Sequence, residues 1–374
     1  MHKLISYFLK NTDQKKSVRN TDYILVVIIL VLMAFGLVIL YSTSSYNGRV
    51  KFDDSAYYFK KQLFATVLGI LCMFVVSRID YHEMIRFAPL VYVSSLILST
   101  LVLFIGDEYN GSKRWLSLGP FSFQPAELAK LAVVLFITWI ICKNKKKTGF
   151  GLIVKVLILI LPIVALVGSN NLSTAVIILG IAIILIFVSN PHYVQFVGLG
   201  GVCILFLGVF LAMESYRLER LAVWRNPEAY DKGFQTLQGL LAIGSGGLFG
   251  NGLGNSMQKL GFVPESQNDM IFSIICEELG LIGAGFVILL FGVLIYRLFK
   301  ISMGYIDLEG LLVSAGIMAH IALQVILNIA VVTNTIPNTG ITLPFISYGG
   351  TSVLFLLSEM GLAISVSQYS NRRV

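Results

Sequence analysis

The sequence predicts an all-α protein that crosses a membrane about ten times, and composition and hydropathy both support this. Of its 374 residues, 56% are hydrophobic and 13% are charged, against about 25% charged residues in a soluble domain. The mean hydropathy is +0.82. Apolar runs of about 20 residues recur along the chain, and each is long enough to cross roughly 30 Å of hydrocarbon. A β-barrel would need alternating segments of about ten residues, and the sequence has none.

The apolar runs predict a single transmembrane domain, residues 23–369. An N-terminal tail (1–22) precedes it and a short C-terminal end (370–374) follows it. The tail is polar and basic, and no small-residue cleavage site follows it, so we expect no cleavable signal peptide. We expect spans at 23–42, 62–77, 85–105, 125–142, 150–168, 173–189, 194–213, 270–297, 308–332 and 348–368.

Lysine and arginine indicate the orientation of these spans. They gather in the tail and in the short connections that would share its side of the membrane. Positive charge in short loops marks the cytoplasmic side, so we expect both termini in the cytoplasm. This placement also accounts for the net charge of +8 without nucleic-acid binding. The outward-facing segments are then 43–61, 106–124, the long loop 214–269, and 333–347.

Several polar residues interrupt the apolar spans, where an ionisable side chain is by default a functional hypothesis. Glu127 and Lys130 are three residues apart and can form an ion pair on one helix face. The pair could be purely structural or could face a substrate. His320, Gln324 and Asn328 recur every fourth residue, and Ser352 and Glu359 are seven apart on the last span. We expect these two stripes to form hydrogen bonds between helices.

Two outward segments have the composition of a binding site. In the long loop, six glycines lie between Gly244 and Gly254, and glycine permits close approach of a backbone to a ligand. A flexible loop is the alternative. Polar residues nearby favour a bound polar substrate: Gln235, Ser245, Lys259, Glu265 and Asp269. Prolines and glycines break the second segment, 333–352. This fits a substrate cavity or a transporter with discontinuous helices, although no two-half repeat supports the transporter.

Asp269 stands at the outer end of the expected eighth span. As a helix N-cap it would have a depressed pKa. Burial and the neighbouring Glu265 would instead raise its pKa. The sequence leaves both alternatives open. Glu277 and Glu278 lie about 12 Å further along, at 1.5 Å per residue, and we expect them to be structural.

Three stretches resemble one family. They are NGSKRWLSLGPFSFQPAELAK from Asn110, the run from Gly233 to Gly280, and PNTGITLPFISYGGTS from Pro337. These motifs are long and ordered, and the likeness covers almost the whole chain. The sequence therefore resembles the shape, elongation, division and sporulation (SEDS) family, which includes FtsW, RodA and SpoVE. The segment GNGLGNSMQK is most similar to the division-type FtsW form and to SpoVE.

The resemblance implies a peptidoglycan glycosyltransferase that polymerises lipid II at the outer face of the bacterial cytoplasmic membrane. It also implies a class B penicillin-binding transpeptidase and other divisome proteins as partners, with the division septum as the location. The essential acidic residue of the family falls on Asp269. Matching motif positions make substrate-binding candidates of Lys113, Arg114, Trp115, Gln124, Glu127, Lys130, Ser347, Gly349 and Gly350.

The chain departs from the family pattern at three places. Before Pro337, Asn334 and Thr335 replace commoner small or apolar residues. Met270 replaces the aromatic residue that usually follows the aspartate. Asn171 stands in a segment where many members carry a carboxylate, so a role for that carboxylate does not carry over.

The implied mechanism has Asp269 as general base for the acceptor sugar hydroxyl and undecaprenyl pyrophosphate as leaving group. Cations would stabilise the pyrophosphate, and the candidates are Lys113, Arg114, Arg217, Arg220 and Lys259. A divalent cation (Mg²⁺ or Mn²⁺) on the pyrophosphate is left open, since no cluster of ligands demands one. The rival hypotheses are a lipid II flippase and a non-catalytic scaffold that recruits the transpeptidase.

Overall fold

The structure is a computed structural model that describes residues 21–109, 112–118, 121–144, 149–190, 221–304 and 307–369. Within these ranges, nine helices are long and apolar enough to cross a membrane. They are α2 (Tyr23–Phe52), α3 (Tyr57–Arg78), α5 (Ala88–Ile105), α6 (Pro125–Lys143), α7 (Phe150–Asn170), α8 (Leu172–Ser189), α12 (Ile271–Met303), α13 (Leu308–Val332) and α14 (Gly350–Tyr369). They confirm nine of the expected spans. The remaining one, 194–213, lies outside the described residues.

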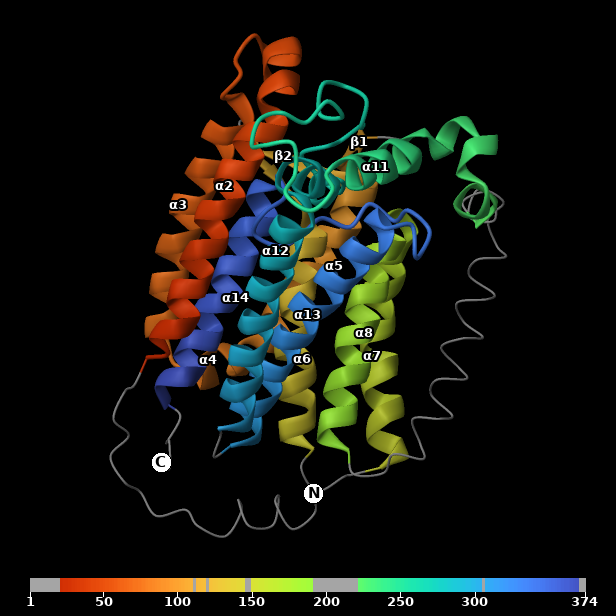
Figure 1. The fold of residues 1–374 in the computed structure, drawn as a ribbon. Helices are drawn as coiled ribbons and strands as arrows, with labels where there is room; N and C mark the ends of the chain where they lie inside the picture. Colours follow the sequence, from red (N-terminus) through yellow and green to blue (C-terminus); the bar gives the residue numbers. More distant parts are fainter. Residues whose placement is uncertain are drawn as a thin grey trace.

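The nine helices stand side by side as one bundle (Figure 1). Inner helices are the most enclosed: 78% of the apolar window of α6 is buried, against 28% for α3 and α5. The apolar side chains that remain exposed on the outer helices match a hydrocarbon environment. The two described ends of the chain meet at the lower end of the bundle, where the Asp22 N–H donates to Ser367 Oγ at 3.4 Å.

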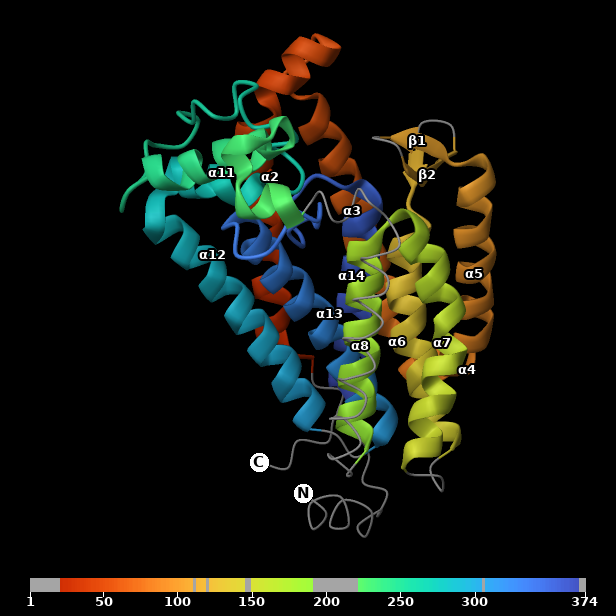
Figure 2. The ribbon, with the colours of Figure 1, turned by 90° about the vertical axis from the view of Figure 1, so that its right-hand side faces the viewer.

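The upper end of the bundle in Figure 1 carries structure that the sequence did not predict. Segment 106–124 contains three short antiparallel strands, in the order β1 (Asp107–Tyr109), β2 (Ser112–Leu118) and β3 (Phe121–Phe123). The long loop contains α11 (Phe234–Ser245), preceded by two 3₁₀ turns, η1 (Pro227–Ala229) and η2 (Asp231–Gly233). Figure 2 shows α11 lying across the bundle, with β1 and β2 on the other side. These elements form the rim of the site described below.

At the lower end, the expected third span begins later than predicted. A short helix, α4 (Tyr81–Arg86), precedes α5 and is separated from it by Phe87. The Asp80 carboxylate caps α4 by accepting the His82 N–H at 3.0 Å. Pro89 stands in the first turn of α5, where its missing N–H removes no helical hydrogen bond.

A break divides α12 at Gly280, which adopts φ 66° and ψ −166°. The N–H groups of Leu281 and Ile282 donate to the carbonyls of Gly247 and Leu248, at 2.9 and 3.2 Å. Residues 281–303 alone measure about 34 Å at 1.5 Å per residue, which is enough to cross the hydrocarbon. The helix begins at Ile271, so the expected start of the span 270–297 is confirmed, and the break at Gly280 lies inside it.

The glycine-rich loop completes the other side of the break. The N–H groups of Asn251 and Gly252 donate to the carbonyls of Glu277 and Glu278, both at 2.9 Å. A Cβ on Gly250 would come within 2.2 Å of the Glu278 carbonyl oxygen, so only glycine permits this approach. The close approach of the Gly250 backbone is thus to α12.

Candidate functional site

A cavity of about 1070 Å³ lies at the upper end of the bundle. Side chains from β1, β2, α6, α8, α11, α13 and the 333–349 segment line it, and polar residues predominate. Ten sequence-predicted candidates line this cavity: Arg114, Trp115, Gln124, Glu127, Lys130, Gln235, Glu265, Asp269, Gly349 and Gly350. Residues far apart in the sequence thus line one cavity.

Four described candidates do not line the cavity, and each has a different contact: Lys113, Ser245, Ser347 and Lys259. Lys113 Nζ donates to the Phe104 carbonyl at 3.4 Å on the exposed surface. Ser245 Oγ donates to the Ala242 carbonyl within α11. Ser347 Oγ accepts the Leu343 N–H and donates to the Asn268 carbonyl, so it shapes the backbone near the cavity without lining it. Arg217 and Arg220 lie outside the described residues.

Lys259 is the clearest correction among the predicted cations. It is buried, and its Nζ lies 2.6 Å from Glu278 Oε1 and 3.0 Å from Ser42 Oγ. A buried ammonium held by a carboxylate has no path to a pyrophosphate in the cavity. Glu277 accepts hydrogen bonds from Ser256 Oγ and from the Met257 N–H. The structural role expected for Glu277 and Glu278 is confirmed.

Asp269 precedes α12 and is partly buried at the wall of the cavity. It is not the N-cap: that position is Met270, and no side chain caps the helix. Gln235 Nε2 lies 3.4 Å from Asp269 Oδ1. Removal from water, together with the negative charge of Glu265, raises the pKa of Asp269 to about 7. A carboxylate with a pKa near neutrality is suited to exchange protons with a bound hydroxyl.

The polar stripes predicted within the spans meet beneath the cavity. Lys130 Nζ lies 3.0 Å from Glu127 Oε1 and 3.0 Å from Gln324 Oε1, so the predicted ion pair is confirmed. His320 contacts Gln324 at 2.9 Å and Glu359 on α14 at 2.7 Å. These contacts confirm the expected hydrogen bonding between helices, and they fix the inner wall of the site.

Sequence reasoning missed several residues of the cavity. Asp107 and Glu108 belong to β1, and their segment was expected to be only a loop. The other missed residues that line it include Lys51, Trp224, Asn334, Asn338, Thr339 and Thr342. The last four belong to the broken segment 333–352, and its prolines and glycines were the signal that could have found them.

Asn171, where many relatives carry a carboxylate, also lines the cavity. Its Oδ1 accepts the Thr174 N–H at 3.2 Å and so caps α8. The neighbouring Asn170 carbonyl accepts from Arg114 Nε at 2.9 Å. The Asn170 backbone carbonyl therefore supports the position of Arg114.

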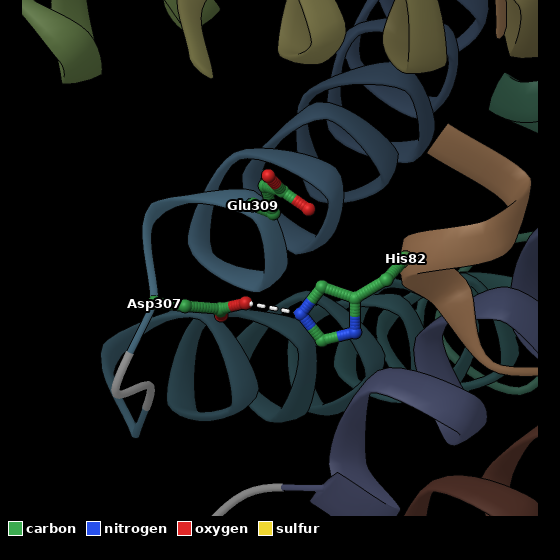
Figure 3. Close-up of side chains that lie close together, drawn as sticks. All are labelled: His82, Asp307 and Glu309. Carbon is green, nitrogen blue, oxygen red and sulfur yellow. Dashed lines mark hydrogen bonds and ion pairs between the residues drawn. The ribbon is translucent and has the colours of Figure 1, made fainter. Parts of the chain in front are cut away.

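At the opposite end of the bundle, His82, Asp307 and Glu309 lie close enough together to be considered as metal ligands (Figure 3). The His82 ring nitrogens lie 2.8 Å from Asp80 Oδ1 and 2.8 Å from Asp307 Oδ2. The hydrogen bond with Asp307, supported by Asp80, raises the pKa of His82 to about 9. With its ring nitrogens bonded to these two carboxylates, His82 forms an ion pair that joins α4 to the start of α13.

The comparisons agree with this fold. The model of the FtsW/RodA/SpoVE family, described as cell cycle protein, matches residues 22–372, and the chain belongs to this family. Over 94% of the chain and 98% of the relative, it is 40% identical to stage V sporulation protein E of Bacillus subtilis (strain 168). It is 35% identical to the probable peptidoglycan glycosyltransferase FtsW of Trichlorobacter lovleyi, over 94% of the chain and 95% of the relative.

Two solved structures are also similar. A chain from a structure described as the structural coordination of polymerization and crosslinking by a peptidoglycan synthase complex has a TM-score of 0.77 and 28% identity, covering 93% of this chain and 97% of its own. The rod shape determining protein RodA of Thermus thermophilus has a TM-score of 0.69 and 27% identity, covering 94% of this chain and 98% of its own.

Proposed function

We propose that this protein is a peptidoglycan glycosyltransferase that polymerises lipid II into glycan strands. The observation that carries the proposal is Asp269, a carboxylate with a raised pKa on the wall of a large polar cavity at one end of a membrane-spanning bundle. The names of the FtsW relatives supply the reaction class.

The cavity faces outward in this proposal. The opposite end of the bundle carries Arg78, Arg86, Lys143, Arg297 and Lys300 at or near helix ends. Positive charge of this kind marks the cytoplasmic side, which places both termini in the cytoplasm. A lipid-anchored sugar would then meet Asp269 at the outer membrane surface with its tail in the bilayer.

The chemistry is one displacement. Asp269 takes the proton from the 4-hydroxyl of the acceptor N-acetylglucosamine, and that oxygen attacks the anomeric carbon of the donor N-acetylmuramic acid. The bond from this carbon to the pyrophosphate oxygen breaks, the configuration inverts, and undecaprenyl pyrophosphate leaves as an anion. The leaving group needs positive charge and no proton. Arg114 lines the same cavity, and a guanidinium is well suited to bind pyrophosphate oxygens in pairs.

A divalent cation, Mg²⁺ or Mn²⁺, would enter the site bound to the pyrophosphate of the substrate. Asp107 and Glu108 line the cavity and offer the oxygen ligands that such ions prefer. When bound, the ion would neutralise charge on the leaving group. The steps assigned to Asp269 and Arg114 do not depend on it.

The partner in this proposal is a class B penicillin-binding transpeptidase, which would cross-link the new strand. The similar chain from a peptidoglycan synthase complex that couples polymerization and crosslinking supports this choice. The FtsW relatives favour work at the division septum with the divisome, while the sporulation protein E relative points to a sporulation septum as the alternative.

The test uses purified protein in detergent, with and without its transpeptidase, and labelled lipid II. Wild type is compared with Asp269→Asn and Asp269→Ala on a gel that separates glycan strands. We expect ladders from wild type alone. Ladders from all three proteins would remove Asp269 as the base. Folded wild type that makes no ladder even with the partner would overturn the polymerase, and a vesicle assay for lipid II flipping would follow. If neither activity were found, a scaffold would remain.

A further inference from the structure

Two side-chain amides connect the 333–349 segment to Asp269. Gln235, in the first turn of α11, directs its Nε2 at the Pro264 carbonyl (3.1 Å) and at Asp269 Oδ1 (3.4 Å). Its Oε1 accepts a hydrogen bond from Asn338 Nδ2 at 3.0 Å. Asn338 Oδ1 in turn accepts the Gly340 N–H at 3.1 Å. The contacts form one chain from Gly340 to Asp269.

The direction of this chain is fixed at both ends by the backbone. The Pro264 carbonyl can only accept, so the Gln235 atom that faces it must be the amino group. The Gly340 N–H can only donate, so the Asn338 atom that faces it must be the oxygen. The remaining atoms, Gln235 Oε1 and Asn338 Nδ2, are then a matched acceptor and donor. Neither amide can rotate by 180° without placing like atoms together.

The segment that carries Asn338 is itself held by three side chains, one on α8 and two on α13. Ser173 Oγ on α8 donates to the Thr339 carbonyl at 2.6 Å. On α13, Asn328 Nδ2 donates to the Ile341 carbonyl at 2.7 Å, and Gln324 Nε2 donates to the Thr342 carbonyl at 3.1 Å. Asn338 is therefore presented to Gln235 by a well-supported backbone.

We infer that Asn338 is a positioning residue that acts through Gln235, holding the Gln235 amino group toward the carboxylate of Asp269. The inference rests on the proposed function, in which Asp269 is the base. A hydrogen bond to the charged form of a carboxyl favours that form. Gln235 thus opposes burial and Glu265, both of which favour the protonated acid. Without Asn338 only the Pro264 carbonyl holds the Gln235 amide. Its amino group is then less firmly held toward Asp269, so a smaller fraction of Asp269 is ionised at neutral pH.

The test compares Asn338→Ala, Gln235→Met and the double variant, none of which adds charge. The pH dependence of initial polymerisation rates is measured for each. We expect the midpoint to move to higher pH in Asn338→Ala and further in Gln235→Met. A shift of one unit would lower the rate about tenfold on the acidic side, relative to each variant's own alkaline plateau. The double variant should match Gln235→Met, because Asn338 acts only through Gln235.

Asn255→Ala is the matched control. Asn255 is an exposed amide of the same outer loop that bonds to the Asn251 carbonyl and does not line the cavity. Its midpoint should equal that of wild type. A lower rate with an unmoved midpoint in Asn338→Ala and Gln235→Met would show a merely structural role and overturn the inference.

A second readout separates this inference from the proposed function. Infrared difference titration detects the protonated carboxyl group, and the signal that disappears in Asp269→Asn belongs to Asp269. Its midpoint should move upward in Asn338→Ala whether or not the protein polymerises lipid II. An unmoved infrared midpoint overturns the positioning role, while missing glycan with a shifted infrared midpoint counts against the polymerase alone.

Discussion

Asn328, in the last turns of α13, donates from its side-chain nitrogen to the main-chain oxygen of Asp269 at 2.9 Å. The same nitrogen bonds the Ile341 carbonyl at 2.7 Å. One buried amide therefore holds both the backbone at Asp269 and the broken 333–349 segment. We expect Asn328→Leu to leave these oxygens without a donor, at about 1–3 kcal/mol for each buried group. Thermal unfolding in detergent should show a clear loss of stability, with weaker polymerisation.

Thr333→Ala is the control for this substitution. Thr333 Oγ1 is exposed and bonds only within the end of α13 and its turn. The melting temperature should change little. Equal melting of wild type and Asn328→Leu would show that the amide does not hold the two segments.

The polymerisation rate should depend on pH through Asp269. With a pKa of about 7, the carboxyl is protonated at pH 6 and ionised at pH 8, so activity as a base should rise through neutrality. Glu265→Gln removes the nearby negative charge that raises this pKa. The midpoint should therefore move to lower pH, and initial rates between pH 5.5 and 8.5 would measure it. A midpoint that stays in place or moves upward would contradict the assigned cause.

Asp269→Asn should stabilise the fold at alkaline pH although it removes the base. The pKa of Asp269 is raised from 3.8 to about 7 on folding, so between these values the folded state binds more protons than the unfolded state. Stability is then lost as pH rises from about 4 to 7. The neutral asparagine side chain in Asp269→Asn does not titrate, so the variant does not lose this stability as the pH rises. Its melting temperature should exceed that of wild type at pH 8, and the difference should shrink by pH 5.

The Lys259–Glu278 pair offers a test of its structural role. Lys259→Met leaves a buried carboxylate without its cation, and breaking a buried pair in this way costs about 3–5 kcal/mol. The double variant Lys259→Met with Glu278→Gln removes both charges and should recover much of the melting temperature. If Lys259 instead bound pyrophosphate, its loss would raise the KM for lipid II, and the double variant would not restore it.

The sequence predicted what depends on local spacing. Glu127 pairs with Lys130 and His320 contacts Gln324 because three or four residues return a helix to the same face. The apolar runs predicted nine of the described helices because each run is long enough to cross the hydrocarbon. Asp269 was found through its motif, and the structure adds the neighbours that set its pKa.

What the sequence did not predict depends on partners far along the chain. A single glycine within an apolar run is compatible with an unbroken helix, and the acceptors that break α12 at Gly280 lie more than thirty residues earlier. Strands β1 and β3 have three residues each, too few for a pattern. Asn338 gains its role only because a broken segment brings it beside α11, and no spacing encodes that meeting.

The break in α12 has a consequence for how this region opens. Four hydrogen bonds cross it, and each joins one partner in the glycine-rich loop to one in the helix. Neither part can release them without the other. The amide hydrogens of Asn251, Gly252, Leu281 and Ile282 should therefore exchange with solvent deuterium in a single cooperative event. Asp269 lies just before this helix, so the free energy of that local unfolding also sets the fraction of molecules in which the surroundings of Asp269 are intact.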